Sequence, residues 1–213
     1  MNNILPQEKK ENLLLIFTRN PEFGKCKTRL AATVGKQTAL DIYKFLLDHT
    51  VAITKNATAT KEVHYSVAIR ENDIWNGSIY NKKLQRGHDL GTRMAYAFSA
   101  SLEVYKKVII IGSDMYDLNT ADIDDAFNFL DRHDYVLGPA EDGGYYLLGM
   151  KVFNKKLFTN KKWGTETVLK DTLDNLKNDN IKLLKTKNDV DFYEDIKDIG
   201  AFQPFLKNIK HDK

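Results

Sequence analysis

Residues 108–111, with the sequence Val-Ile-Ile-Ile, constrain the fold more than any other part of the chain. Four consecutive β-branched residues favour an extended backbone, and a continuous apolar run of this length is typical of a strand buried on both faces. Residues 13–17, Leu-Leu-Leu-Ile-Phe, form a second run of this kind. Further strands are predicted at 63–69, 135–137, 145–150 and 181–185, and helical segments at 36–55, 89–105, 120–132, 166–178 and 191–207. Apolar strands that alternate with helices predict a mostly parallel sheet with helices on both faces.

The chain is long enough to bury one sizeable hydrophobic core. Its 213 residues, 42% of them hydrophobic, are typical of a globular protein and argue against disorder. No internal repeat, low-complexity tract or Pro/Gly-rich linker divides the sequence. We therefore expect a flexible polar tail at residues 1–11 and a single α/β domain over residues 12–207.

Charge and cysteine content exclude or disfavour several classes of protein. The 32 Lys and Arg residues and 29 Asp and Glu residues give a net charge of +3 that is spread along the chain, without the basic stripe of many nucleic-acid-binding proteins. Cys26 is the single cysteine, which excludes an internal disulfide and a cysteine-based zinc cluster. The N-terminus has no apolar core of signal-peptide length, and the longest apolar run is too short to cross a bilayer. We expect a cytoplasmic protein with no transmembrane segment and no nucleic-acid partner.

A basic loop follows the strand predicted at 13–17. Residues 19–30 contain four cations, namely Arg19, Lys25, Lys27 and Arg29. Gly24 would let backbone N–H groups approach an anion, and the cations would make charge-assisted hydrogen bonds to phosphate oxygens. The spacing matches neither a Walker loop nor the G-x-G-x-x-G fingerprint. On the local sequence, a solvated basic surface loop is an equally weighted alternative.

Two aspartates follow the other buried strands. Asp114 comes after residues 108–111, where a carboxylate could hold Mg²⁺ or Mn²⁺; the alternative is that it caps a turn or helix. Asp142 precedes two glycines after residues 135–137, and it is predicted to be a second metal ligand or a base that deprotonates an acceptor. A plain hairpin turn is the alternative there. Because ligands bind at the carboxyl ends of strands in such sheets, the three loops are expected to meet at one edge.

Three further features have mainly structural interpretations. Asp89 is expected to cap the helix that follows it, within a glycine-containing segment at 85–94 that could approach a base or phosphate. Asp191 with Glu194 matches a capping box, so a structural role is favoured over a metal role. Trp163 is expected to pack at a turn and not to stack on a ligand.

Taken together, these segments resemble a family of small bacterial glycosyltransferase-like proteins, also called radical-SAM/selenodomain-associated transferases. The resemblance spans residues 13–199, and it is the order and spacing of the pieces that make it specific. The matching pieces are 17–21, 24, 27–30, 85–94, 112–114, 138–140, 142–145, 163–165, 189–191 and 194–195. The chain departs from the family pattern at Met115 and Tyr116, where the family usually has Ser-Pro. Loss of the proline changes the turn after Asp114, and Tyr116 is expected to narrow the site or stack on a ligand.

The resemblance implies the Rossmann-like GT-A fold of the nucleotide-diphospho-sugar transferases, as a single domain. It also implies that Asp114 binds the metal, Mg²⁺ or Mn²⁺. The residues implied to bind the nucleotide are Arg19, Gly24, Lys27, Arg29, Gly91 and Arg93. We assign Asp142 as the catalytic residue that positions or deprotonates the acceptor.

These residues predict a metal-dependent transferase, and three hypotheses follow. The leading hypothesis is glycosyl transfer from a nucleotide-diphosphate sugar to a small-molecule acceptor. The closest alternative is nucleotidyl transfer, in which a phosphorylated small molecule attacks a nucleoside triphosphate and pyrophosphate leaves. The third is a non-catalytic nucleotide-binding sensor, motivated by the altered turn at 115–116.

Overall fold

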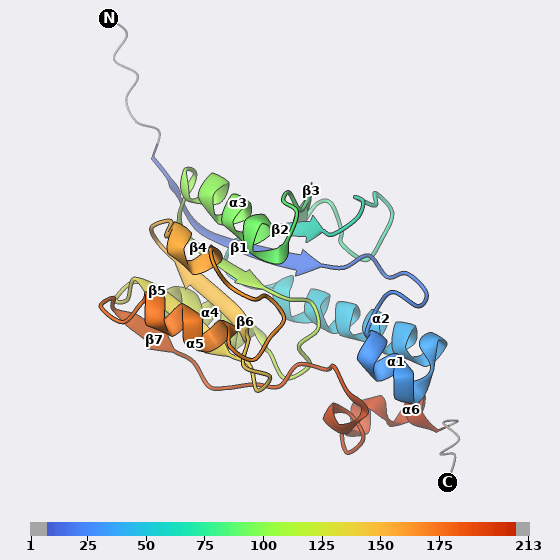
Figure 1. Cartoon of the computed structure of the whole chain (residues 1–213). Coiled ribbons are helices and arrows are strands. Elements are labelled where there is room, and N and C mark those ends of the chain that lie inside the picture. The colour runs from blue at the N-terminus through green and yellow to red at the C-terminus, as the bar shows by residue number, and fades with distance from the viewer. Residues whose placement is uncertain (1–7, 208–213) are drawn as a thin grey trace, which may run out of the picture.

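A computed structural model describes residues 8–207, which form one seven-stranded sheet flanked by helices (Figure 1). The strands are β1 (Lys10–Thr18), β2 (Thr60–Tyr65), β3 (Tyr80–Leu84), β4 (Tyr105–Ile111), β5 (Tyr135–Pro139), β6 (Tyr145–Met150) and β7 (Ile181–Leu183). The α-helices are α1 (Thr28–Val34), α2 (Lys36–Thr54), α3 (Leu90–Leu102), α4 (Thr120–Phe129), α5 (Val168–Asn175) and α6 (Gln203–Leu206). The strand order is β3-β2-β1-β4-β6-β5-β7.

The sheet is parallel except at β6, so the predicted fold class is confirmed. β1 pairs in parallel with β2 and β4, β2 with β3, and β5 with β7, whereas β6 runs antiparallel to β4 and β5. β6 reverses because a tight turn joins it to β5, in which the Ala140 N–H donates to the Gly144 carbonyl at 3.0 Å. Since β1, β4 and β5 point the same way, the loops that follow them lie at one edge of the sheet, as predicted.

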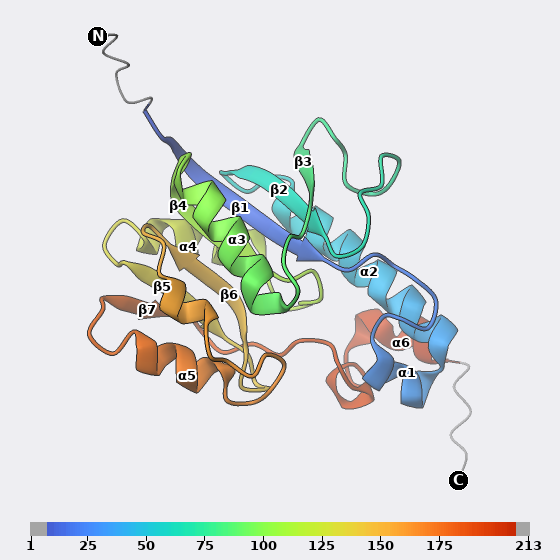
Figure 2. The ribbon, with the colours of Figure 1, turned by 45° about the horizontal axis from the view of Figure 1, so that its top comes forward.

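Helices cover both faces of the sheet (Figure 2). On one face, Tyr43 and Leu47 of α2 and Phe127 of α4 belong to the same core cluster as alternate residues of β1 and β4. On the other face, Phe98 of α3 and Leu173 of α5 pack with the remaining residues of those strands. Residues 13–16 of β1 and 108–111 of β4 are thus buried on both sides.

A third core cluster lies beyond the carboxyl edge of the sheet. Leu30 of α1 and Leu46 of α2 pack there against Val190 and Phe202 from the C-terminal part of the chain. Figure 1 shows α6 beside α1, far from the preceding strand β7. The C-terminal segment therefore returns across the edge of the sheet where the three predicted loops meet.

Several elements differ from the sequence predictions. β3 falls mainly within a segment expected to be a polar loop, because it is an edge strand in which only Tyr80 is buried. α1 was not predicted, since seven residues are too few for a clear helical period. The helical region expected at 191–207 is two short 3₁₀ turns and the four-residue α6. Asp89 does cap α3, since its Oδ1 accepts from the Thr92 N–H at 2.7 Å.

The N-terminal tail predicted at residues 1–11 overlaps the sheet, because Lys10 and Glu11 begin β1. Residues 1–7 of that tail lie outside the described residues, and the domain limits at 12–207 stay a prediction. Within residues 8–207, no helix is both long and apolar enough to cross a membrane.

Candidate active site

Two cavities adjoin at the carboxyl edge of the sheet. The larger, here called the basic cleft, has a volume of about 660 Å³ and lies between the loop after β1 and the start of α3. The smaller, here called the apolar cavity, has a volume of about 240 Å³ and lies between the β5–β6 turn and the segment at 163–168. Phe17, Leu90, Gly112 and Asp114 line both cavities. Asp114 therefore stands on the boundary between the two.

The basic cleft is lined by four cations, namely Arg19, Lys27, Arg29 and Arg93. The first three come from the loop after β1 and the start of α1, and Arg93 comes from the first turn of α3. Arg93 is fixed by two hydrogen bonds, from its Nε to the Gly87 carbonyl at 3.0 Å and from its Nη1 to Gln85 Oε1 at 3.3 Å. Cations from two segments that are far apart in the sequence therefore line one cleft, and their binding of a nucleotide stays a prediction.

Tyr43 of α2 anchors the loop after β1. Its hydroxyl donates to the Arg19 carbonyl at 2.9 Å, accepts from the Arg19 N–H at 3.0 Å, and lies 3.3 Å from Ser113 Oγ. Burial raises the pKa of this phenol, so it stays protonated and can keep donating. The sequence does not reveal this role of Tyr43, because helical periodicity does not show where the hydroxyl of a tyrosine lies.

Lys27 is the most deeply placed cation of the cleft. Its Nζ donates to Asp114 Oδ2 at 2.8 Å and to Asp191 Oδ1 at 2.9 Å, and its side chain is only 5% exposed. Burial alone would lower the pKa of Lys27, but the attraction of the two carboxylates outweighs it and raises the pKa. Arg29 reaches the other oxygen of Asp191 at 3.1 Å from a more exposed position. The lysine therefore carries a full positive charge at the boundary of the two cavities.

Asp114, Asp189 and Asp191 form an acidic cluster in which one oxygen of each lies within 4.8 Å of the others. Asp189 and Asp191 flank Val190, which is buried in the third core cluster and holds this segment beside the loop after β4. Burial, followed by repulsion from Asp114 and Asp191, raises the pKa of Asp189 to about 6. The side chain of Asp189 makes no hydrogen bond or ion pair within residues 8–207. Three convergent carboxylates are the hard oxygen donors that Mg²⁺ and Mn²⁺ prefer, so the donor set fits a divalent metal.

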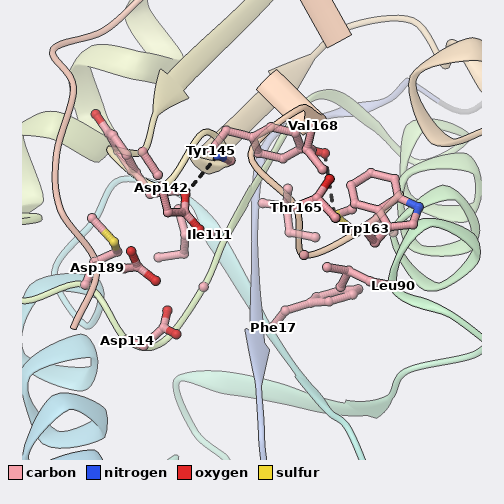
Figure 3. A pocket seen from close by; sticks show the side chains of 18 residues that line it. Phe17, Leu90, Ile111, Asp114, Asp142, Tyr145, Trp163, Thr165, Val168 and Asp189 are labelled. Carbon is pink, nitrogen blue, oxygen red and sulfur yellow. Dashed lines mark hydrogen bonds between the residues drawn. The ribbon is translucent and has the colours of Figure 1, made fainter. Parts of the chain in front are cut away.

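Acidic and aromatic residues line opposite ends of the apolar cavity (Figure 3). Asp114, Asp142 and Asp189 gather at one end, and Phe17, Leu90 and Trp163 lie at the other. Asp142 sits at the tip of the β5–β6 turn, where its Oδ1 accepts from the Gly144 N–H at 2.8 Å. This segment is therefore a hairpin turn and also lines the apolar cavity.

Trp163 fits over a glycine of α3. A Cβ atom added to Gly91 would lie 2.2 Å from Trp163 Nε1, so only glycine permits this contact. The ring of Tyr145 meets the indole edge-on, at 6.4 Å between centroids and an interplanar angle of 86°. Trp163 does pack at a turn, as predicted, but it also forms a wall of the cavity.

Six of the eight predicted site residues line one of the two cavities, and the two glycines, Gly24 and Gly91, do not. Gly24 shapes the basic loop through a positive φ of 70°, and Gly91 lies beneath Trp163. Neither lines a cavity in the described structure. A nucleotide contact with Gly91 would require Trp163 to move, and the nucleotide contact of Gly24 stays a prediction.

Two interpretations of the C-terminal and turn residues are wrong. Asp191 does not cap the following turn, because its carboxylate binds Lys27 and Arg29, while Asp195 Oδ2 accepts the Asp191 N–H at 2.9 Å. Tyr116 does not face a ligand, since it packs edge-on against Phe202 at 4.9 Å in the third core cluster. In the sequence, the acidic cluster is indicated by Asp189 and Asp191, which are two residues apart.

The chain resembles a bacterial protein family and several solved structures. Residues 46–165, more than half of the chain, match the family described as "Uncharacterized protein conserved in bacteria (DUF2064)". No curated protein matches the sequence. A "putative nucleotide-diphospho-sugar transferase" from Desulfovibrio desulfuricans G20 is similar with a TM-score of 0.82 and 27% identity, over 93% of this chain and 94% of that chain.

Two more distant structures share the fold. A cytidylyltransferase from Leptospira borgpetersenii has a TM-score of 0.59 and 12% identity, over 87% of this chain and 83% of its own. Rv0371c from Mycobacterium tuberculosis H37Rv, in complex with manganese, has a TM-score of 0.53 and 12% identity, over 94% of this chain and all of its own. The chain therefore belongs to the DUF2064 family of bacterial proteins, and it is a transferase-like enzyme with the GT-A fold of the nucleotide-diphospho-sugar transferases.

Proposed function

We propose that the protein transfers a sugar from a nucleotide-diphosphate sugar to a small-molecule acceptor, with the help of a divalent metal. The observation that carries this proposal is the contrast between the two cavities that meet at Asp114. The basic cleft is lined by four cations, whereas the residues of the apolar cavity include three carboxylates and no Lys or Arg in the described part of the chain.

The basic cleft suits the nucleoside diphosphate half of such a donor. Guanidinium and ammonium groups bind phosphate oxygens through charge-assisted hydrogen bonds, and Arg19, Arg29 and Arg93 approach the cleft from two sides. The same groups would stabilise the negative charge that grows on the diphosphate as it leaves. The cleft is also large enough for a base and ribose beyond the phosphates.

The apolar cavity suits an uncharged sugar. Trp163, Phe17 and Leu90 offer apolar surface to the carbon face of a ring, and the carboxylates at the other end accept hydrogen bonds from hydroxyls. Apart from the divalent metal proposed below, a phosphorylated substrate would meet three carboxylates there and no Lys or Arg in the described part of the chain. This distribution of charge favours glycosyl transfer over nucleotidyl transfer, in which a phosphate must enter beside the donor.

The acidic cluster is the proposed site of Mg²⁺ or Mn²⁺. Asp114, Asp189 and Asp191 would hold the ion, and a relative with the same fold is described in complex with manganese. The metal would supply Lewis-acid neutralisation of the diphosphate charge. Asp114 lies on the boundary of both cavities, where the bond between sugar and diphosphate would lie.

Asp142 is proposed to act on the acceptor. An acceptor oxygen forms the new bond to the anomeric carbon, the bond from that carbon to the diphosphate oxygen breaks, and the nucleoside diphosphate leaves with the electron pair. The Asp142 carboxylate takes the acceptor proton. One of its oxygens is held by the Gly144 N–H, which fixes the carboxylate while its other oxygen is available to the acceptor.

A thermal-shift panel tests the donor site. Nucleoside triphosphates and nucleotide-diphosphate sugars are each added with Mg²⁺, Mn²⁺ or EDTA. A ligand at a hundredfold its dissociation constant stabilises by about 2.7 kcal/mol, which raises the melting temperature by roughly 5–10 °C for a domain of this size. A metal-dependent shift with one sugar nucleotide is expected. A shift with triphosphates alone would favour nucleotidyl transfer, and no shift would contradict the donor site.

The cytoplasmic location and the absence of a nucleic-acid partner stay predictions.

A further inference from the structure

The ammonium of Lys27 lies between two carboxylates of the acidic cluster, where it balances part of their negative charge. It bonds to Asp114 at 2.8 Å and to Asp191 at 2.9 Å, which are two of the three carboxylates of the cluster. A divalent metal held by this cluster would bind the same two carboxylates. The lysine and the metal therefore compete for the same carboxylates.

The backbone of Lys27 is left-handed. Its φ of 47° and ψ of 51° lie in a region that is unfavourable for a residue with a Cβ. The Lys27 carbonyl accepts the Ala31 N–H at 2.8 Å, so the conformation is fixed at the start of α1. Because the ammonium of lysine is strongly hydrated, its burial at this point depends on the two carboxylates.

The neighbouring cations of the loop lack this arrangement. Lys25 is 65% exposed along its side chain and pairs with Glu22, away from the acidic cluster. Arg29 is 54% exposed and, among the three carboxylates of the cluster, pairs with Asp191 alone in the described part of the chain. Lys27 bonds to two carboxylates of the cluster and also lines the basic cleft, where the donor phosphates are proposed to bind.

We propose that Lys27 is a built-in counter-ion of the acidic cluster, and that the metal binds firmly only when donor phosphates draw the ammonium away from the carboxylates. This inference rests on the proposed donor site. A metal that arrives alone must displace a buried cation and leave it without a partner, which is costly. A diphosphate in the basic cleft offers that cation new oxygen partners, so diphosphate and metal promote the binding of each other. Thermodynamic linkage makes this coupling equal in both directions.

The direct test is titration with Mn²⁺ in the absence of any nucleotide, with free Mn²⁺ measured by electron paramagnetic resonance at pH 8. The variants are Lys27→Met, which removes the charge and keeps most of the length, and Lys27→Asn, in which the new residue tolerates the left-handed backbone. Circular dichroism checks that each is folded. Both are expected to bind Mn²⁺ at least about tenfold more tightly than the wild type, because no cation has to be displaced. Lys25→Met is the matched control and is expected to leave the affinity unchanged.

A second measurement follows the competition between Lys27 and the metal through thermal stability. Mn²⁺ alone should leave the melting temperature of the wild type nearly unchanged and should raise that of Lys27→Met. Wild-type affinity in both Lys27 variants, weaker binding, or no Mn²⁺ binding by any form of the protein would overturn the proposal. Because the titration contains no nucleotide, these outcomes are distinct from a failure of the donor panel, which would overturn the proposed function.

Discussion

Asp142 and Asp189 are carboxylates of one cavity with different surroundings. Asp142 is exposed at the tip of a turn and has one oxygen held by a backbone N–H. Asp189 is half-buried beside Asp114 and Asp191, and its charge is disfavoured by burial and by these neighbours. The first is thus suited to take a proton from an acceptor, and the second is suited to lose its proton when a cation arrives.

Asp142→Asn should abolish most of the turnover without loss of donor binding. An amide keeps the size of the side chain but cannot accept a proton, so a drop of about 10²- to 10⁴-fold in kcat is expected. The measurement is steady-state kinetics together with the thermal shift produced by the donor. Glu141→Gln, at the adjacent exposed residue outside both cavities, is the control and should retain full activity. Equal kcat values for the two variants would remove Asp142 from the mechanism.

The raised pKa of Asp189 should be visible in stability measured with EDTA. The pKa is 3.8 for the ordinary group and about 6 in the folded protein, so folding favours the protonated form. This stabilisation is complete below pH 4 and is lost as the pH rises through 6. Asp189→Asn stays neutral at every pH, so its stability relative to the wild type should increase between pH 4 and pH 7. A difference in melting temperature that does not change over this range would contradict the assigned environment.

At the scale of elements, the sequence predicted those strands and helices whose apolar pattern follows from the burial of their own side chains. The runs at 13–17 and 108–111 are apolar on every residue because both faces of β1 and β4 are covered. β3 could not be predicted in this way, since its backbone ladder to β2 holds it and Tyr80 is its single buried residue. The contact of α3 with Trp163 could not be predicted either, because nothing in the sequence shows which glycine packs against which ring.

Gly91→Ala tests that contact between elements. The new methyl group would overlap the indole of Trp163, so we expect a loss of about 1–3 kcal/mol in the free energy of unfolding and a shift in tryptophan fluorescence. Sugar-nucleotide binding should weaken as the wall of the apolar cavity moves. Gly77→Ala is the control, because an added Cβ there meets nothing within 4 Å. An unchanged fluorescence spectrum in Gly91→Ala would show that the packing is different.

At the scale of the whole molecule, the C-terminal segment completes the site from a distance in sequence. Residues 189–191 supply two of the three carboxylates, and Phe202 holds the following turns against Phe45 and Tyr116. The sequence predicted that three strand-end loops would meet, because parallel strands share an edge. It did not predict that the C-terminal segment would cross this edge, since the pairing of Asp191 with Lys27 depends on the complete fold.

Phe202→Ala should disturb the acidic cluster as well as the core. Removal of this fully buried ring is expected to cost about 3–5 kcal/mol of stability and to weaken Mn²⁺ binding, because the segment that carries Asp189 and Asp191 loses its anchor. Phe158→Ala is the control, because it removes a buried ring from the second core cluster, which does not contain Phe202. It should reduce stability by a similar amount while it leaves Mn²⁺ binding unchanged at a temperature where both variants are folded. Equal effects on Mn²⁺ binding would contradict a specific link between the C-terminal segment and the cluster.

The identity of the leaving group tests the central claim most directly. Phosphorus-31 NMR can follow the reaction of the wild-type protein with Mg²⁺, the donor found in the thermal-shift panel and a mixture of small hydroxyl-bearing acceptors. Asp114→Asn is the inactive comparison. The two-cavity arrangement predicts that nucleoside diphosphate accumulates from the sugar nucleotide and that Asp114→Asn releases little or none. Pyrophosphate formed from a nucleoside triphosphate and a sugar phosphate, with sugar nucleotides left intact, would contradict glycosyl transfer and assign the site to nucleotidyl transfer.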